Sequence, residues 1–249
     1  MSGHSKWATI KHKKGATDAK RGRLWTKCIK EIQVAARLGG GEINSNPRLR
    51  KAVATAKGAA MTADNITRAI KRGTGELEGK NYEEMTYEGT GPGGTLFIVE
   101  TLTDNKNRTV AELRKIFEKN NATLGSSGTA GWAFDRKGLI EIKREAADED
   151  KMMDLVVGAG ADDYVDEGES WAITTPGDQL DTVGKALEAA GITPTSQKLG
   201  WVPKNKKEVA GREAEMCLRL ADILDDHDDV QDVYSDFDVS DEEMAKFDA

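Results

Sequence analysis

The chain changes character near residue 80, and this change constrains the fold more than any other feature of the sequence. Residues 1–80 carry 18 Lys and Arg against six Asp and Glu, which is a net charge of +12. Residues 81–249 carry 18 Lys and Arg against 37 Asp and Glu, a net charge of −19. Segments of such opposite charge favour separate modules, and 249 residues are enough for two or three domains. We therefore expect a basic N-terminal domain followed by acidic ones.

The basic segment has the periodicity of α-helices. Apolar residues recur at a spacing of three to four between Thr17 and Leu38, which predicts a first helix with one buried stripe. Asn46-Pro47 predicts the start of a second helix, because an N-cap residue is followed by Pro at the first helical position. Thr62 predicts the cap of a third, shorter helix. Residues 1–80 are therefore interpreted as a three-helix basic bundle that ends in a polar linker.

Strands and helices alternate in the acidic remainder. A strand at Thr95–Thr101, a helix at Arg108–Asn120 and a short strand at Gly131–Phe134 predict one half of a split β-α-β unit. A helix at Glu208–Leu224 and a strand at Val230–Phe237 are expected to complete that half. The elements expected between them are strands at 138–143, 163–166, 170–175 and 195–202 and helices at 148–157 and 178–190. Their order, βαββαβ, is typical of a ferredoxin-like domain.

The predicted architecture is therefore α+β and multidomain, with one α+β domain inserted in the other. Residues 1–80 form the basic helical domain. Residues 81–136 and 204–249 form a discontinuous α+β domain, and residues 137–203 form the inserted ferredoxin-like domain. In this arrangement the basic domain is expected to bind a partner while the acidic domains are held away from it.

The first thirty residues predict the chemistry of that partner. They hold nine Lys and Arg against one Asp, a net charge of +8 in a protein whose net charge is −7. Such a local excess indicates nucleic-acid phosphates, although a merely solvated basic face is the alternative. Trp7 either stacks on an unpaired base or anchors the basic arm to the bundle. The predicted nucleic-acid-binding residues are Lys6, Trp7, Lys11, His12, Lys13, Lys14, Lys20, Arg21, Arg23, Lys27 and Lys30.

Two further motifs resemble ligand-binding loops, and for both a purely structural interpretation is simpler. The segment Gly89–Gly94 matches G-x-G-x-x-G, but it precedes a strand, and Pro92 lacks the N–H that a phosphate would need. A rigid turn is the favoured interpretation. The run Asp225–Asp229 lacks the spacing of a calcium-binding loop, and a solvated acidic turn between a helix and a strand is expected instead.

No catalytic residue, metal site or cofactor is predicted. The three histidines are not spaced as a pair of helical metal ligands, and no Ser/His/Asp or Cys/His grouping is suggested. Cys28 and Cys217 are interpreted as buried hydrophobic residues. The sequence lacks an apolar run long enough for a membrane helix and lacks the pattern of a signal peptide, so no membrane contact and a cytoplasmic location are expected.

Several motifs in order resemble the YebC family. They are Gly3-His4-Ser5-Lys6-Trp7, Ile10-Lys11-His12-Lys13-Lys14, Asp18-Ala19-Lys20-Arg21-Gly22, Asp64-Asn65-Ile66, Arg68-Ala69-Ile70, Tyr87-Glu88-Gly89, Gly91-Pro92-Gly93-Gly94, Leu102-Thr103-Asp104-Asn105 and Asn107-Arg108-Thr109. The resemblance implies a helical N-terminal domain and two α+β domains. It also implies a DNA-binding transcriptional regulator. Relatives in this family, including a mitochondrial translational activator, act at the ribosome and help translation through proline-rich stretches.

Two functions are therefore carried forward. The first is a non-enzymatic, DNA-binding transcriptional regulator, and the alternative is a translation factor that binds ribosomal RNA. No helix carries Arg, Asn or Gln in evident base-reading positions, which weakens sequence-specific readout of DNA. A basic arm with an aromatic residue suits folded or single-stranded RNA at least as well. Nucleic acid is expected to bind through residues 1–80, and a protein partner of the acidic domains and the oligomeric state are left open.

Overall fold

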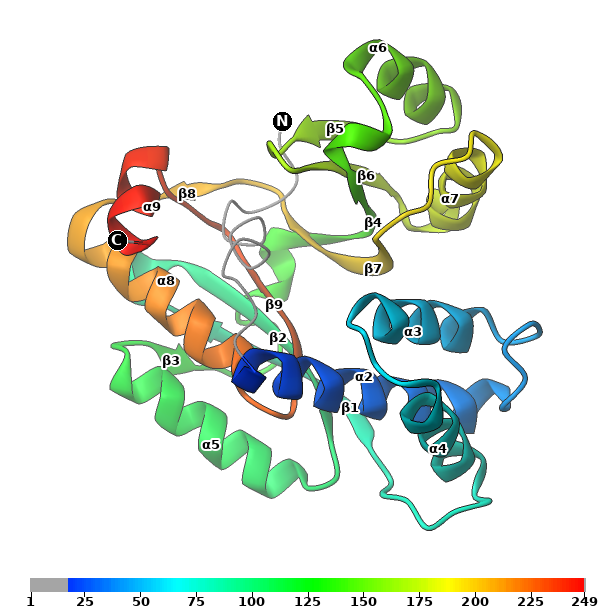
Figure 1. Cartoon of the computed structure of the whole chain (residues 1–249). Helices are drawn as coiled ribbons and strands as arrows, with labels where there is room; N and C mark the ends of the chain where they lie inside the picture. The colour runs from blue at the N-terminus through cyan, green and yellow to red at the C-terminus, as the bar shows by residue number, and fades with distance from the viewer. Residues whose placement is uncertain (1–17, 249) are drawn as a thin grey trace.

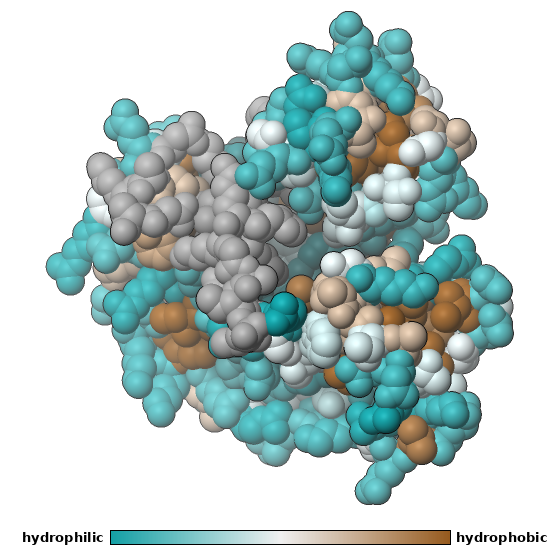
Figure 2. All heavy atoms as spheres, viewed as in Figure 1, coloured by the Kyte–Doolittle hydropathy of each residue, from teal (hydrophilic) through white to brown (hydrophobic). Residues whose placement is uncertain are grey.

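The structure, a computed structural model, describes residues 18–248 and divides into three modules of helices and sheets (Figure 1). A helical bundle precedes two antiparallel sheets, which confirms the predicted α+β class. Within the described range, no helix combines the length and apolar character needed to cross a bilayer. In the face seen in Figure 2 the surface is mainly hydrophilic, and its hydrophobic residues gather in small separate patches.

The N-terminal module consists of α2 (Asp18–Gly39), α3 (Pro47–Gly58) and α4 (Ala63–Thr74). Both predicted caps are present: Asn46 Oδ1 accepts from the Leu49 N–H at 3.0 Å, and Thr62 Oγ1 accepts from the Asn65 N–H at 3.4 Å. Ile32, Leu49 and other apolar residues of the three helices form one buried core. The long helix α2 extends beyond this core toward the second module (Figure 1).

The second module is built on a four-stranded antiparallel sheet in the order β3-β1-β2-β9. The strands are β1 (Glu83–Thr90), β2 (Leu96–Thr103), β3 (Thr123–Leu124) and β9 (Val230–Ser235). Helices α5 (Lys106–Lys119) and α8 (Gly211–Asp225) bury their apolar sides against the sheet. Because β9 follows α8 late in the sequence yet pairs with β2, the chain leaves this module and returns to it.

The third module lies in the sequence between β3 and β8 (Lys207–Glu208). Its sheet is antiparallel, in the order β5-β6-β4-β7, which is the strand order of a ferredoxin-like fold. Its strands are β4 (Phe134–Lys143), β5 (Asp163–Asp166), β6 (Ser170–Pro176) and β7 (Ser196–Pro203). Its helices are α6 (Glu149–Met152), continued by a π-helical segment at Met153–Val157, and α7 (Leu180–Ala189). The predicted insertion of one α+β module in the other is confirmed, and the boundaries at residues 80, 136 and 203 stay predictions.

Some expected elements are wrong or incomplete. Gly131–Ala133 is a 3-10 turn rather than a strand, and β4 begins only at Phe134. Strand β1 was not predicted, because its sequence EEMTYEGT is polar and only one of its eight residues, Gly89, is buried. The parallel pair of β8 (Lys207–Glu208) and β10 (Phe237–Asp238) and the terminal helix α9 (Asp241–Asp248) were not predicted either. Short edge strands carry too few residues for a periodic signal.

The glycine-rich segment is a tight turn, as expected. It joins β1 to β2 through a 3-10 turn at Pro92–Gly94, in which Gly93 and Gly94 have φ values of 66° and 71°. The preceding glycines permit close packing: a Cβ on Gly89 would lie 2.4 Å from the Phe117 ring. The segment therefore connects two strands and does not lead into a helix, as a dinucleotide-binding loop would.

Candidate nucleic-acid interface

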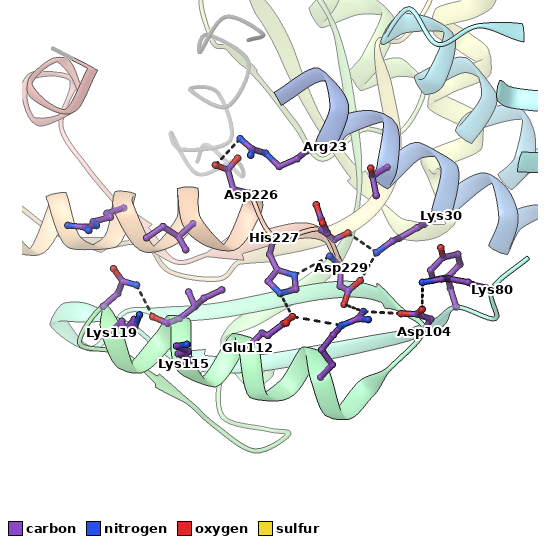
Figure 3. Close-up of a pocket in the computed structure, with 18 residues that line it drawn as sticks. Arg23, Lys30, Lys80, Asp104, Glu112, Lys115, Lys119, Asp226, His227 and Asp229 are labelled. Atoms are coloured by element: carbon purple, nitrogen blue, oxygen red, sulfur yellow. Dashed lines mark hydrogen bonds and ion pairs between the residues drawn. The ribbon is translucent and has the colours of Figure 1, made fainter. Parts of the chain in front are cut away.

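Three cations of α2 face the acidic turn that joins α8 to β9, and Figure 3 shows two of them, Arg23 and Lys30. Arg23 Nη2 lies 3.2 Å from Asp226 Oδ2, and Lys27 Nζ lies 2.9 Å from Asp225 Oδ1. Lys30 Nζ lies 2.5 Å from an oxygen of Asp229. Spacings of four and three residues place the three cations on one side of the helix. The turn supplies a carboxylate for each of them, so α2 and the second module are joined by a row of ion pairs.

The Asp229 carboxylate is the most enclosed group of this contact, since the residue is only 3% exposed. Besides Lys30, it accepts hydrogen bonds from Arg108 Nη2 and Thr109 Oγ1, each at 2.7 Å. Burial alone would raise the pKa of Asp229, but the hydrogen bonds from Lys30, Arg108 and Thr109 hold that pKa well below its usual range. Asp229 therefore remains ionised at neutral pH.

This geometry corrects two expectations from the sequence. Lys30 is 6% exposed, and Lys27 is half-buried against Asp225, so neither belongs to an open basic stripe that a phosphate can reach. Arg23 is partly exposed but already has a carboxylate partner. The acidic turn is not simply solvated, because Asp229 at its end is buried. A pattern of cations predicts charge on a helix, but it does not reveal a complementary turn almost 200 residues later.

The other predicted contacts stand outside the described part of the structure or on its border. Lys6, Trp7, Lys11, His12, Lys13 and Lys14 precede the described residues, and the side chain of Lys20 is likewise not described. Arg21 is exposed in the first turns of α2, where it has an interaction partner. The roles of these residues stay predictions.

A cleft of about 1240 Å³ opens beside the ion-paired turn. It is lined by the first half of α2, the facing sides of α5 and α8, and the turn itself (Figure 3). At its floor, Asp104 accepts from Lys80 at 2.7 Å and from Arg108 at 2.9 Å. These two hydrogen bonds hold the pKa of Asp104 below its usual value, although burial acts in the opposite direction. The acids of the floor are therefore compensated by neighbouring cations.

The walls of the cleft carry three cations that the sequence analysis missed. Lys115 and Lys119 lie one helical turn apart on α5, and Arg219 lies on α8. All three are exposed, and none makes an ion pair with another residue of the described chain. The lining contains seven Lys and Arg against five Asp and Glu, so the cleft is positive in a protein of net negative charge. The i,i+4 spacing of the two lysines was the available signal, but Glu112 and Glu118 on the same helix obscured it.

A metal ion is a second interpretation of this region, and the geometry does not favour it. Within the described chain, Glu112, His227 and Asp229 bring three ligand atoms within 4.8 Å of one another. However, His227 Nε2 lies 3.0 Å from Glu112, and His227 Nδ1 accepts from the Asp229 N–H at 3.1 Å. Both ring nitrogens are thus engaged, and Arg108 and Lys30 occupy the Asp229 oxygens. A cation would have to displace protein donors from each ligand.

Other cations of the bundle also serve contacts within the protein. Arg48 Nε lies 2.7 Å from Glu31, and the same guanidinium pairs with Glu84 on β1. Lys51 Nζ lies 2.9 Å from Asp181 on α7. The bundle is therefore paired electrostatically with both α+β modules. Much of its positive charge is not available to an external ligand.

Comparisons with known proteins agree along the whole chain. Residues 5–76 match the model described as the TACO1/YebC protein N-terminal domain, and residues 82–237 match the TACO1/YebC second and third domain. A probable transcriptional regulatory protein from Desulforapulum autotrophicum is 55% identical over 242 residues, which are 97% of this chain and 98% of that protein. One from Acidithiobacillus ferrooxidans is 54% identical over 249 residues, which are 100% and 99% of the two chains. The crystal structure of a conserved hypothetical protein from Aquifex aeolicus superposes with a TM-score of 0.89 at 41% identity, covering 95% of this chain and 98% of that one.

Proposed function

Because the chain belongs to the TACO1/YebC family, we propose that it is a non-enzymatic, nucleic-acid-binding regulator of gene expression. DNA is the first candidate target, since its curated relatives are named probable transcriptional regulatory proteins. The observation that carries the proposal is the positive cleft, in which Lys115, Lys119 and Arg219 are exposed and lack ion-pair partners in the described chain. Exposed cations on two facing helices are a suitable surface for backbone phosphates.

The basic arm extends this surface. Residues 1–17 lead into α2, and α2 contributes Arg23 to the wall of the cleft. A nucleic acid held by the cleft therefore lies next to the point where the arm enters the fold. Lys11, Lys13 and Lys14 then add phosphate contacts, as the sequence predicts. We therefore expect the cleft and the predicted contacts within residues 1–17 to bind the ligand together.

The chemistry of the described thiols supports a binding role over a catalytic one. Cys28 and Cys217 are both buried, and burial raises the pKa of each thiol to about 11. A protonated, enclosed thiol is a poor nucleophile at neutral pH.

Binding to ribosomal RNA, with a role in translation, is the second candidate, and the engagement of α2 favours it. Lys27 and Lys30 of this helix contact the acidic turn, so this face of α2 cannot enter a major groove as a recognition helix does. The remaining cations suit contacts with phosphates, which position a ligand without reading its sequence. Folded RNA is recognised largely by such contacts and by shape.

Crosslinking in living cells, followed by sequencing of the attached nucleic acid, separates the two candidates. A transcriptional regulator should enrich promoter DNA, and a translation factor should enrich ribosomal RNA. A variant with Lys115, Lys119 and Arg219 changed to Ala serves as the control, because it should recover much less of either. Recovery of ribosomal RNA alone would reject the DNA-binding role, and equal recovery by the variant would reject the cleft.

A further inference from the structure

Trp132 is the most exposed large hydrophobic residue of the described chain. Its side chain is 69% exposed, and it lies in the 3-10 turn that precedes β4, directly after a loop rich in Gly and Ser at residues 125–131. A single exposed hydrophobic residue is ordinary on a protein surface. Trp132 differs because the backbone that carries it is fixed by several hydrogen bonds.

The carboxylate of Glu88 on β1 holds this loop. It accepts from the N–H groups of Gly128 at 3.0 Å, Ala130 at 2.6 Å and Gly131 at 2.7 Å. Burial alone would raise the pKa of Glu88, but these three backbone donors keep it below its usual value, so the anion persists at neutral pH. Three charge-assisted hydrogen bonds to one carboxylate make the loop rigid.

The indole itself is oriented as well. Trp132 Nε1 donates to the Thr129 carbonyl at 3.1 Å, so the polar edge of the ring is satisfied within the loop. On the other side, Lys204 Nζ donates to the Trp132 carbonyl at 2.8 Å. The side chain of Trp132 therefore loses little conformational entropy when a ligand packs against its ring.

The other tryptophans of the described chain have partners. Trp171 is buried beneath the Arg144 guanidinium, Trp201 lies 5.0 Å from Arg136, and Trp25 donates to the Ala59 carbonyl from a half-buried position. Trp132 alone among them presents an open ring face. The cation beside it is Lys204, whose Nζ donates to the Trp132 carbonyl and makes only one ion pair among residues 18–248, a long, exposed contact of 3.7 Å with Asp135.

From this combination we propose that Trp132 stacks on an unpaired base of the bound nucleic acid, with Lys204 close to the adjoining phosphate. A preoriented aromatic face beside cations is the arrangement by which single-stranded nucleic acid is held without reading its sequence. The inference rests on the proposed function and deepens it, because it specifies a ligand with unpaired bases. Gly89 faces Phe117 of α5, so its neighbour Glu88 and the loop that Glu88 holds lie on the opposite face of the sheet from α5 and α8. A strand that reaches both Trp132 and the cleft must therefore pass around the edge of the sheet.

The test measures binding of a fluorescein-labelled single-stranded 12-mer to the full-length protein and to W132A, W132F and M153A. Met153 is the matched control, because it is 59% exposed but belongs to the third module. We expect W132A to weaken binding of the single strand by about 5- to 100-fold, and W132F to retain much of the affinity. M153A should bind the single strand as tightly as wild type, and W132A should keep the wild-type salt dependence of binding. W132A should also bind the corresponding duplex within about twofold of wild type.

Two further measurements separate stacking from a structural effect. Replacing the bases of the 12-mer by abasic sites should abolish the difference between wild type and W132A. The emission of Trp132, measured as the difference in fluorescence between wild type and W132F, should be quenched by the 12-mer and not by its abasic form. Equal binding of the single strand by wild type and W132A, or an equal loss with the abasic strand, would overturn the inference while leaving the proposed function intact. A wild-type protein that binds no nucleic acid would overturn both.

Discussion

At the scale of single residues, the protein depends on one buried carboxylate. The Asp229 carboxylate accepts hydrogen bonds from Lys30 of α2 and from Arg108 and Thr109 of α5, at distances of 2.5 to 2.7 Å. These partners belong to two different modules. A buried charge of this kind is stabilising only while its partners remain, since an unpaired buried charge is costly.

Asp229→Asn should therefore destabilise the protein strongly. The substitution keeps the shape of the side chain but leaves Lys30 buried with no carboxylate, and we expect a loss of about 3–5 kcal/mol in the free energy of unfolding. Asp228→Asn is the matched control, because Asp228 is exposed and its change should stay within about 0.5 kcal/mol. Urea unfolding followed by circular dichroism compares the two. Equal midpoints for both variants would show that the buried pair contributes nothing.

The same carboxylate should make stability depend on pH. The pKa of Asp229 is lowered in the folded protein, so the unfolded chain binds a proton more readily at acid pH. Its contribution is present in full above the ordinary pKa of about 4 and is lost as the pH falls toward the folded value. Wild type should therefore lose stability between about pH 5 and pH 3 more steeply than Asp229→Asn, in urea unfolding at each pH. Parallel pH profiles would contradict this role.

At the scale of elements, the β1–β2 hairpin depends on the absence of a side chain at Gly89. A Cβ there would lie 2.4 Å from the Phe117 ring and 2.8 Å from the Thr123 carbonyl, which are both parts of the packed module. Gly89→Ala should cost about 1–3 kcal/mol, because the buried ring and strand β3 cannot move without loss of packing.

Gly22→Ala tests the opposite case, since Gly22 lies in α2 with no atom within 4 Å of the added Cβ. It should stabilise the helix by about 0.5–1 kcal/mol. Thermal unfolding measures both variants. A destabilised Gly22→Ala or a neutral Gly89→Ala would contradict the packing described here.

The helices and strands also show how much of the fold and of the site can be predicted from the sequence alone. Capped and periodic segments such as α2, α3 and α5 were predicted, because their caps and apolar spacing are local properties. Strand β1 was not, because its polar sequence carries no apolar alternation and the strand is defined by its partners β2 and β3. The site was predicted least well: cationic spacing on α2 was visible, but its pairing with Asp225–Asp229 depends on contacts distant in the sequence.

At the scale of the whole molecule, opposite charge joins the modules instead of separating them. The bundle pairs with the second module through Arg23, Lys27 and Lys30, and with the third through Lys51. The sequence predicts that the acidic modules are held away from the partner of the basic domain, and it does not indicate that they contact the bundle directly. What remains for an external polyanion is the cleft with Lys115, Lys119 and Arg219, together with the predicted arm.

The most direct test of this account is the salt dependence of nucleic-acid binding for K115A/K119A/R219A. The control is K143A/K151A/K185A, which removes the same charge from exposed positions of the third module. A plot of log K against log[salt] should be less steep by about 2–3 for the cleft variant than for wild type, because three phosphate contacts are lost. The control should keep the wild-type slope. Identical slopes for all three proteins would contradict the assignment of the cleft as the phosphate-binding surface.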